Sequence, residues 1–269
     1  MVYILIPVHN RKLMTLTCLE AISTQTYHQI KVTVIDDGSI DGTSESIQKK
    51  FPDVNLIRGD GTWWWGGAMN KGLASVLPQM EDEDFVLLLN DDTKFNNQYI
   101  EYLVHASTSN NRALVGSLAR NLHNPANVKD GGIRIDWEKF IFNKEYREGP
   151  HIIAVDALSG RGMLVPAEVF RKIGDFGTLF PQVASDLNFS LRAKRAGFNL
   201  VMSYDAVILS DDVLEKIKRP FFWRYFNRKS NDNIRSRLLI AWLHAPSLRL
   251  KIKDTFIICW RCFRYALTA

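Results

Sequence analysis

Two adjacent carboxylates follow a short apolar segment, Phe85–Leu89, in this chain of 269 residues. Five apolar residues in a row without alternation predict a strand that is buried on both faces. Asn90, Asp91 and Asp92 come directly after it, and open α/β sheets form ligand sites at the carboxyl ends of their strands. Paired carboxylates there suit a hard divalent cation that also holds a diphosphate. The alternative is an exposed turn with solvated acids.

Two further polar turns follow predicted strands. They read Pro7-Val8-His9-Asn10 and Asp36-Asp37-Gly38-Ser39. The carboxyl ends of parallel strands meet at one edge of a sheet, so the three turns are expected to lie together. For Asp36 and Ser39 we favour a structural role, in which they cap the turn and the following helix.

The turns are positioned by strands that alternate with helices. Expected strands cover 3–6, 31–35, 54–57 and 85–89, and expected helices cover 11–25, 41–50 with Asp41 as N-cap, and 68–77. This alternation predicts βαβ units and a parallel sheet, so residues 1–110 form a Rossmann-like, nucleotide-binding half of an α/β domain. The first strand is not followed by GxGxxG and no GxxxxGK occurs, which argues against a dinucleotide-binding fingerprint and a P-loop ATPase.

Residues 111–212 are expected to complete the domain as an acceptor half. Expected strands lie at 113–118, 131–135, 200–202 and 206–209, a polar loop at 120–130, a small apolar segment at 157–165, and helices at 167–173 and from about 187 to 197.

Residues 213–269 differ from the rest in charge. They hold 13 Lys and Arg against 3 Asp and Glu, whereas the other 212 residues hold 21 against 26. Such a basic tail points to an anionic surface as its partner, and its mixed aromatic and basic residues are typical of an interfacial amphipathic helix. The alternatives are helices that simply cap the sheet, or nucleic-acid binding, which we consider least favoured because the body offers no recognition fold.

Composition otherwise indicates an ordinary globular protein, with 46% apolar and 23% charged residues. Three cysteines are too few for a disulfide framework, which fits a reducing cytoplasm. We expect no signal peptide and no membrane span, because no apolar run reaches about 20 residues.

The order and spacing of the three turns resemble those of the family 2 glycosyltransferases, which share the GT-A fold. The resemblance covers Met1 to about Asp212. It implies an inverting transfer that uses Mg²⁺ or Mn²⁺, bound by Asp92. It also implies a nucleotide site in which Asp37 binds the base and Asp91 reaches the ribose or assists the metal. The turn that borders the nucleotide would be formed by Pro7, Val8 and His9 with Asn10.

The segment Trp63–Gly72 resembles the Gly/Ala-rich segment of the same family, which ends in Asn-x-Gly. The resemblance implies that Asn70 opens or borders the helix lining the donor pocket. Tryptophans can stack on a base or a sugar, and we expect Trp65 near the donor and Trp63 and Trp64 in the core.

The segment Ser185–Arg192 resembles the acid-Asp-x-Asp…Arg motif of the family, with its central acid at Asp186. Inverting transfer needs a general base within reach of the acceptor hydroxyl, and the resemblance assigns that role to Asp186. Ser185 and Asn188 replace two acids of the motif. Asp186 as a helix N-cap is an alternative that can coexist with catalysis.

Many relatives carry a further metal ligand after the last strand of the sheet. Ser210, Asp211 and Asp212 occupy that region here, and the sequence leaves the choice among them open.

The resulting hypothesis is a glycosyltransferase most similar to rhamnosyltransferases of bacterial surface polysaccharides. Its donor would be a UDP- or dTDP-sugar, and its acceptor a lipid-linked glycan at the inner face of the cell membrane. The alternatives are a sugar nucleotidyltransferase and an inactive nucleotide- or carbohydrate-binding module. The departures at Asn90, Ser185 and Asn188 keep the latter open.

Overall fold

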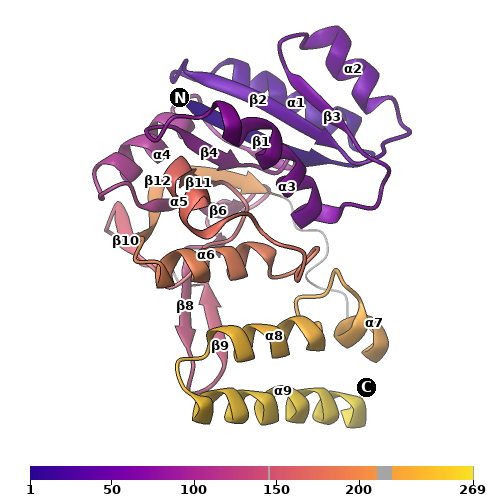
Figure 1. The fold of residues 1–269 in the computed structure, drawn as a ribbon, viewed down its shortest axis with the longest axis vertical. Coiled ribbons are helices and arrows are strands. Elements are labelled where there is room, and N and C mark those ends of the chain that lie inside the picture. Colours follow the sequence, from indigo (N-terminus) through magenta and orange to yellow (C-terminus); the bar gives the residue numbers. More distant parts are fainter. Residues whose placement is uncertain (145, 211–219, 269) are drawn as a thin grey trace.

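The computed structural model describes residues 1–144, 146–210 and 220–268 (Figure 1). Its centre is a ten-stranded sheet with the order β10-β12-β6-β11-β4-β1-β2-β3, in which β5 pairs with β12 and β7 pairs with β6. The strands are β1 Val2–Val8, β2 Ile30–Asp36, β3 Asn55–Arg58, β4 Phe85–Leu88, β5 Thr93–Lys94, β6 Leu114–Asn121, β7 Val128–Asp130, β10 Ile152–Ala154, β11 Met163–Pro166 and β12 Leu200–Ser210. A separate hairpin is formed by β8 Ile133–Asp136 and β9 Ile141–Lys144.

The helices alternate with the strands in the first half, as expected for βαβ units. They are α1 Lys12–Ser23, α2 Thr43–Lys50, α3 Trp64–Val76, η1 Leu77–Gln79, α4 Tyr99–Thr108, α5 Ala167–Ile173, α6 Ser185–Arg195, α7 Phe221–Phe226, α8 Ile234–His244 and α9 Leu248–Thr268.

The register of the sheet brings the predicted turns to one edge. β1 runs parallel to both β2 and β4, with Val8 opposite Asp36 and Leu5 opposite Leu88. The chain segments that follow these three strands therefore leave the sheet side by side. β11 runs antiparallel to β4 and β6, so the sheet is mostly, but not entirely, parallel.

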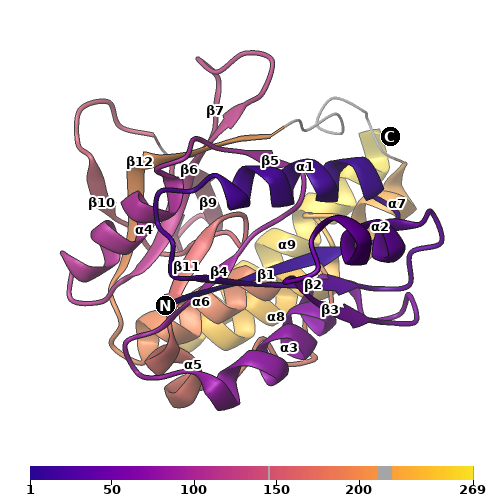
Figure 2. The same ribbon diagram turned by 90° about the horizontal axis from the view of Figure 1, so that it is seen from above.

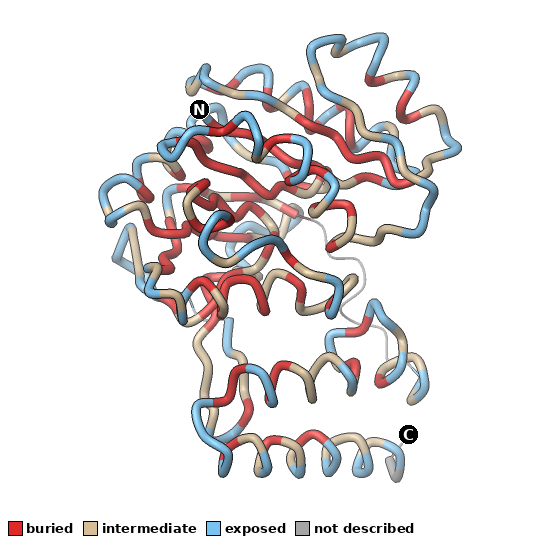
Figure 3. Tube along the Cα trace, viewed as in Figure 1, coloured by how far each residue is buried: buried red, intermediate tan, exposed pale blue. Residues whose placement is uncertain are grey.

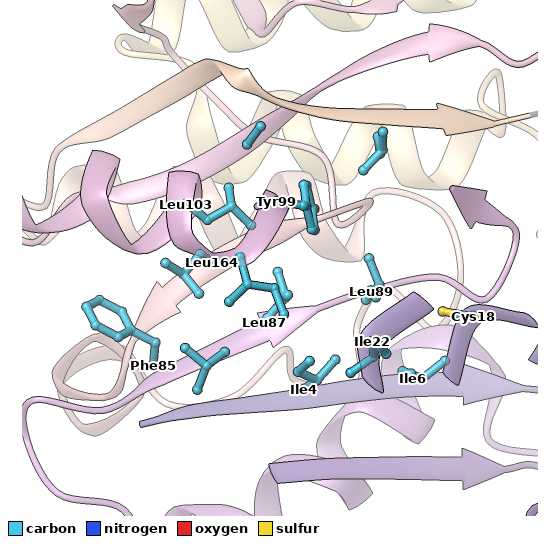
Figure 4. Close-up of a cluster of buried hydrophobic side chains, with 14 of the residues drawn as sticks. Ile4, Ile6, Cys18, Ile22, Phe85, Leu87, Leu89, Tyr99, Leu103 and Leu164 are labelled. Carbon is cyan, nitrogen blue, oxygen red and sulfur yellow. The ribbon is translucent and has the colours of Figure 1, made fainter. Parts of the chain in front are cut away.

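Helices cover both faces of the sheet, and each face has its own buried core. Figure 2 shows α1 and α3 on opposite sides of β1. The core beneath α1 and α4 includes Ile4, Ile6, Cys18, Leu87 and Leu103 (Figure 4). A second core lies beneath α3, α5 and α6. Strands β1 and β4 lie between the two cores, which explains why their sequences are continuously apolar.

The basic C-terminal segment is a packed helical layer. Figure 1 shows α8 below α6 and α9 below α8, with the β8–β9 hairpin reaching down to both helices. Phe140 of the hairpin, Ala241 of α8 and Ile258 of α9 form a small buried cluster. His244 Nε2 lies 2.9 Å from Asn188 Oδ1 of α6. The helices α8 and α9 thus pack on the hairpin and α8 also contacts α6. In the described ranges, no helix has the length and apolar content that a membrane span requires.

Some expected boundaries were wrong for identifiable reasons. α3 begins at Trp64 rather than at residue 68, and Trp64 has a φ of 59°. Gly42, not Asp41, is the N-cap of α2, while Asp41 Oδ1 accepts the Thr43 amide. The strands expected at 200–202 and 206–209 are one strand, β12, with an irregularity between Ser203 and Val207.

Candidate active site

The turn after β4 presents its carboxylates to the end of β1. Asp91 is buried, and its Oδ1 accepts a hydrogen bond from Arg11 Nη1 at 3.0 Å while its Oδ2 accepts one from Thr15 Oγ1 at 3.1 Å. Arg11 Nη1 also donates to Asp92 Oδ2 at 3.2 Å. Burial raises the pKa of Asp91, and the charge of Arg11 acts against that shift. Both carboxylates therefore share one guanidinium group.

The surroundings of Asp92 fit a divalent cation. Its Oδ1 is buried and has no hydrogen-bond partner among the described residues, so a lone pair is available there. The same residues include no group of three or more His, Cys, Asp and Glu placed to hold a metal. A cation on Asp92 would thus take most of its ligands from water and from a diphosphate, a coordination that Mg²⁺ commonly adopts.

The end of β12 lies beside this turn. Strand β5 pairs antiparallel with β12, which places Thr93 opposite Ser210. Ser210 Oγ accepts a hydrogen bond from Arg161 Nη1 at 3.0 Å. Asp211 and Asp212, the other candidates for a further metal ligand, lie outside the described residues.

Arg11 was not singled out from the sequence, where it marks only the start of a helix. A usable signal was present, because Arg11 directly follows the Pro7–Asn10 turn. The strand before that turn pairs with the strand before the two acids. A cation in that position is therefore within reach of both carboxylates.

Trp65 connects the acidic turn with the predicted base. Its indole Nε1 donates to Asn90 Oδ1 at 3.2 Å. On the other side the ring touches Gly160, where an added Cβ atom would lie 2.6 Å from two ring atoms and 3.2 Å from the Asp186 Cβ. Phe176 meets the ring edge-on with centroids 5.3 Å apart, which fixes its orientation. Trp65 thus lies between the Asn90–Asp92 turn and Asp186.

Asp186 lies at the start of α6 with its carboxylate held by backbone amides. Oδ2 accepts from Gly160 N at 2.7 Å and Oδ1 accepts from Leu187 N at 2.8 Å. Ala184 precedes the helix as N-cap with a φ of 67°, so Asp186 is the second helical residue rather than the N-cap. Each oxygen retains capacity to accept a further hydrogen bond.

Asp37 organises the loop that leads into α3. Oδ1 accepts from Gly61 N at 2.9 Å, and Oδ2 accepts from Trp63 N at 3.0 Å and from Trp64 N at 3.1 Å. These bonds hold Trp64 in its left-handed conformation and explain the early start of α3. The neighbouring Asp36 is structural as expected, because it accepts the Ser39 amide at 2.9 Å and the Ser44 hydroxyl.

The Pro7–Asn10 turn contacts the Asp37 turn. His9 Nδ1 lies 2.6 Å from the Asp37 carbonyl oxygen, so this nitrogen carries the proton, and Nε2 accepts from Asn10 Nδ2 at 3.0 Å. Pro7 and Val8 belong to β1, and the Val8 side chain is buried in the core. Val8 can therefore border a ligand with its backbone only.

Asn70 lies in the interior of α3, not at its start. Its Nδ2 donates to the Gly177 carbonyl at 3.1 Å and its Oδ1 accepts the Phe176 amide at 3.0 Å. Both ends of the side-chain amide thus hold the loop before α6. A contact between Asn70 and the nucleotide-sugar donor stays a prediction.

The other two tryptophans are half-buried. Trp63 packs against the core with Lys71 over its ring, whereas Lys229 lies over the Trp64 ring at 5.6 Å. The expectation that both lie in the core was therefore wrong for Trp64.

Comparison with known proteins decides the family. The model of "Glycosyl transferase family 2" matches residues 3–170. The chain belongs to this family. It is 24% identical over 250 residues to the N-acetylglucosaminyl-diphospho-decaprenol L-rhamnosyltransferase of Mycobacterium tuberculosis, covering 85% of this chain and 81% of the relative. It is also 23% identical over 211 residues to the glycosyltransferase AglE of Haloferax volcanii, and the match covers 77% of this chain and 65% of AglE.

Solved structures agree on the fold. GalNAc-T7 with UDP, GalNAc and Mn²⁺ superposes with a TM-score of 0.67 at 13% identity, covering 95% of this chain but only 54% of GalNAc-T7. The mannosyltransferase PcManGT from Pyrobaculum calidifontis with GDP-Man and Mn²⁺ superposes with a TM-score of 0.60 at 16% identity. The match covers 100% of this chain and 75% of PcManGT. These structures confirm the predicted GT-A fold, and the family model and the relatives confirm the predicted family membership and glycosyltransferase activity.

Proposed function

We propose that this glycosyltransferase moves a sugar from a UDP- or dTDP-sugar to a hydroxyl of a lipid-linked glycan, with inversion and with a divalent metal. Bacterial surface polysaccharide synthesis is the process that fits such a transfer. The observation that carries the proposal is the position of Trp65, which touches the Asn90–Asp92 turn on one side and the Gly160–Asp186 pair on the other. A donor sugar over this ring would have a metal carboxylate at its diphosphate and a base near its anomeric carbon.

The relatives support the finer points. The name of the Mycobacterium tuberculosis relative states a lipid diphosphate acceptor and a rhamnosyl group. Two structural neighbours were solved with Mn²⁺ together with UDP or GDP-Man. We therefore keep Mg²⁺ or Mn²⁺ as the cofactor and a nucleotide-diphosphate sugar as the donor.

Each predicted residue has a role in the proposed reaction. Asp92 would hold the metal ion, which when bound stabilises the negative charge of the departing diphosphate. The donor nucleotide would contact Pro7, Val8, His9, Asp37, Trp65, Asn70 and Asp91. Asp37 would accept a hydrogen bond from the nucleobase in addition to those from its three backbone donors, because a carboxylate has about four lone-pair sites.

Asp186 acts as the general base. The Gly160 and Leu187 amides fix its carboxylate and leave lone pairs directed away from those bonds. One oxygen takes the proton of the acceptor hydroxyl as the hydroxyl oxygen bonds to the anomeric carbon. The bond from that carbon to the diphosphate oxygen breaks, so the configuration inverts.

The test is release of nucleotide diphosphate from UDP-, dTDP- and GDP-sugars, with and without Mn²⁺. We expect slow donor hydrolysis by the wild type that needs metal and is lost in Asp92→Ala. Asp53→Ala is the matched control, because Asp53 is an exposed acid between α2 and β3. Metal-independent hydrolysis, or full activity in Asp92→Ala, would contradict the assignment of the metal site.

The alternatives are separated by parallel incubations with other substrates. A sugar nucleotidyltransferase would release pyrophosphate when it is supplied with a nucleoside triphosphate and a sugar phosphate. A binding module would retain nucleotide and turn over no donor, even when acceptor is supplied.

We also propose contact with an anionic membrane at the inner face of the cell membrane, through α9. One side of this helix carries a stripe of exposed apolar residues, Ile252, Phe256, Trp260 and Phe263, between 46% and 71% exposed. Figure 3 shows exposed turns on the side of α9 that faces away from α8. Arg249, Lys251 and Arg264 lie on the same helix, and basic residues beside an apolar stripe are typical of interfacial helices.

A further inference from the structure

A cationic cavity lies within the C-terminal layer, apart from the carboxylate site. Its volume is about 340 Å³. Four arginines line it together with one acid and two tyrosines: Arg224, Arg237, Arg261 and Arg264, with Asp232, Tyr225 and Tyr265. Four guanidinium groups and one carboxylate give this lining a net charge of +3. Such a lining suits an anion with several oxygens.

Three of the arginines are held in place. Asp232 Oδ2 accepts from Arg224 Nε at 2.7 Å, and Asp232 lies 2.9 Å from Arg237 Nη2 through Oδ1. Arg261 donates to the carbonyl oxygens of Phe140 and Lys139 at 3.1 and 3.0 Å. The cavity is therefore preformed, which lowers the entropy lost when a ligand binds.

The positive charge of Arg237 is only partly compensated by the described residues around it. Burial lowers the pKa of Arg237, and the nearby Arg261 and Arg224 lower it further, while Asp232 opposes both effects. Arginine stays protonated in proteins, so this repulsion is a standing free-energy cost. A bound anion would relieve it.

The elements that form the cavity also reach the catalytic edge, by which we mean the sheet edge and loops that carry Asp37, Asp91, Asp92 and Asp186. Figure 1 shows α7 beside the C-terminal end of α9. From the loop after α7, Lys229 Nζ lies over the Trp64 ring. From the start of α8, Arg235 Nη1 donates to the Leu179 carbonyl at 3.3 Å, in the loop before α6.

We infer that the arginine cavity binds the phosphate groups of the lipid-linked acceptor. This inference rests on the proposed function, because it assumes an acceptor with a phosphate or diphosphate between sugar and lipid. The sugar would then extend toward Trp65 and Asp186, and the lipid would run along the exposed stripe of α9. Guanidinium forks bind phosphate oxygens in pairs, and four of them around one cavity suit a group with more oxygens than a single carboxylate has.

The first experiment measures binding of inorganic pyrophosphate and farnesyl diphosphate to the full chain by calorimetry. A metal chelator is present, so that the metal-dependent donor site does not contribute. We expect Arg237→Gln/Arg264→Gln to weaken both ligands at least tenfold. Arg249→Gln removes one positive charge from α9 outside the cavity lining, as Arg264→Gln does inside it, and should bind as the wild type does.

Two further measurements guard this interpretation. Arg237 pairs with Asp232, so its replacement could disturb folding; Arg264→Gln alone changes an exposed side chain and should weaken binding about threefold or more. Equal binding by wild type, Arg264→Gln and the double variant overturns the inference. Donor hydrolysis by the wild type without acceptor is measured in parallel, because its absence would point to failure of the proposed function instead.

Vesicles distinguish the source of the phosphate. Vesicles of neutral phospholipid that carry a polyprenyl diphosphate sugar should bind the wild type more tightly than vesicles in which phosphatidylglycerol supplies the same total charge. The double variant should lose this preference. Equal binding to both kinds, with equal loss in the double variant, would assign the cavity to bulk lipid headgroups and overturn the acceptor assignment.

Discussion

At the catalytic edge, buried Asp37 and Asp91 accept hydrogen bonds through both carboxylate oxygens. In the C-terminal layer, Asp254 of α9 is fully buried, and neither oxygen has a hydrogen-bond partner among the described residues. Burial raises its pKa to about 6, while burial lowers the pKa of His244 in the same layer to about 4. The two regions thus treat buried polar groups differently.

The difference indicates what each region is built for. Amides and Arg11 fix the edge carboxylates in one geometry, which a transfer reaction requires. The C-terminal layer instead presents a cationic cavity and an apolar stripe, and the buried carboxylate of Asp254 has no hydrogen-bond partner among the described residues. We expect substitutions at the edge to change the rate, and substitutions in the layer to change attachment and stability.

The largest effect is expected for Asp186→Asn. Removal of the proposed base should lower kcat for sugar transfer about 10³-fold, within the range usual for general bases. Donor affinity, measured by calorimetry with the nucleotide diphosphate, should stay within about twofold, because Asn retains acceptor capacity toward the Gly160 amide. Transfer at the wild-type rate would remove Asp186 from the mechanism.

A smaller effect is expected in the layer for Phe256→Ser/Trp260→Ser. Loss of two aromatic side chains from the exposed stripe should weaken binding to anionic vesicles about 100-fold, as expected from their apolar area. Leu13→Ser is the matched control, because Leu13 is 79% exposed on α1. Sedimentation with vesicles measures the change, and equal binding by all three proteins would rule out membrane contact through α9.

Trp65→Phe should have a moderate effect at the edge. It keeps an aromatic ring but removes the hydrogen bond to Asn90 Oδ1, so the acidic turn loses one positioning contact. We expect kcat/KM for the donor to fall about tenfold, equivalent to about 1.4 kcal/mol. Trp63→Phe should leave kcat/KM for the donor nearly unchanged. An equal loss in both variants would mean that the hydrogen bond from Trp65 to Asn90 does not position the acidic turn.

The smallest effect concerns the pH dependence of stability. A carboxyl group with a raised pKa favours the folded state below its unfolded pKa of 3.8, and this advantage is lost as the pH rises through about 6. Asp254→Asn should therefore stabilise the fold at pH 8 by about 1 kcal/mol, allowing for screening. It should have little effect near pH 4.

His244 has the opposite effect on the pH dependence of stability. Because its pKa is lowered, its contribution to the stability of the folded state is complete above its unfolded pKa of 6.5 and is lost as the pH falls through about 4. Thermal unfolding from pH 4 to 8 separates the two groups. If Asp254→Asn and wild type have the same profile, the burial of Asp254 carries no free-energy penalty.

The parts of the fold that follow from local sequence could be predicted. An apolar run such as Phe85–Leu89 specifies a buried strand, and polar turns after parallel strands specify the edge where a site forms. The pairing of Asn90 with Trp65 and the bond from Gly160 to Asp186 could not be predicted, because they join residues 25 and 26 positions apart through the fold.

Longer-range contacts decided the errors. Arg11 reaches Asp91 across 80 positions, and Asn70 holds Phe176 across 106. Trp64 starts a helix in a conformation that its side chain disfavours, because the distant Asp37 accepts its amide. The orientation of α8 and α9 depends on the β8–β9 hairpin, which the basic composition of the tail does not reveal.

The three hydrogen bonds to Asp37 also have a kinetic consequence. Since the 61–64 segment is already tied down before any donor arrives, nucleotide recognition does not have to wait for this loop to order. Association should then proceed in a single phase whose rate rises linearly with donor concentration, and differences in affinity among donors should be expressed mainly in how fast they leave.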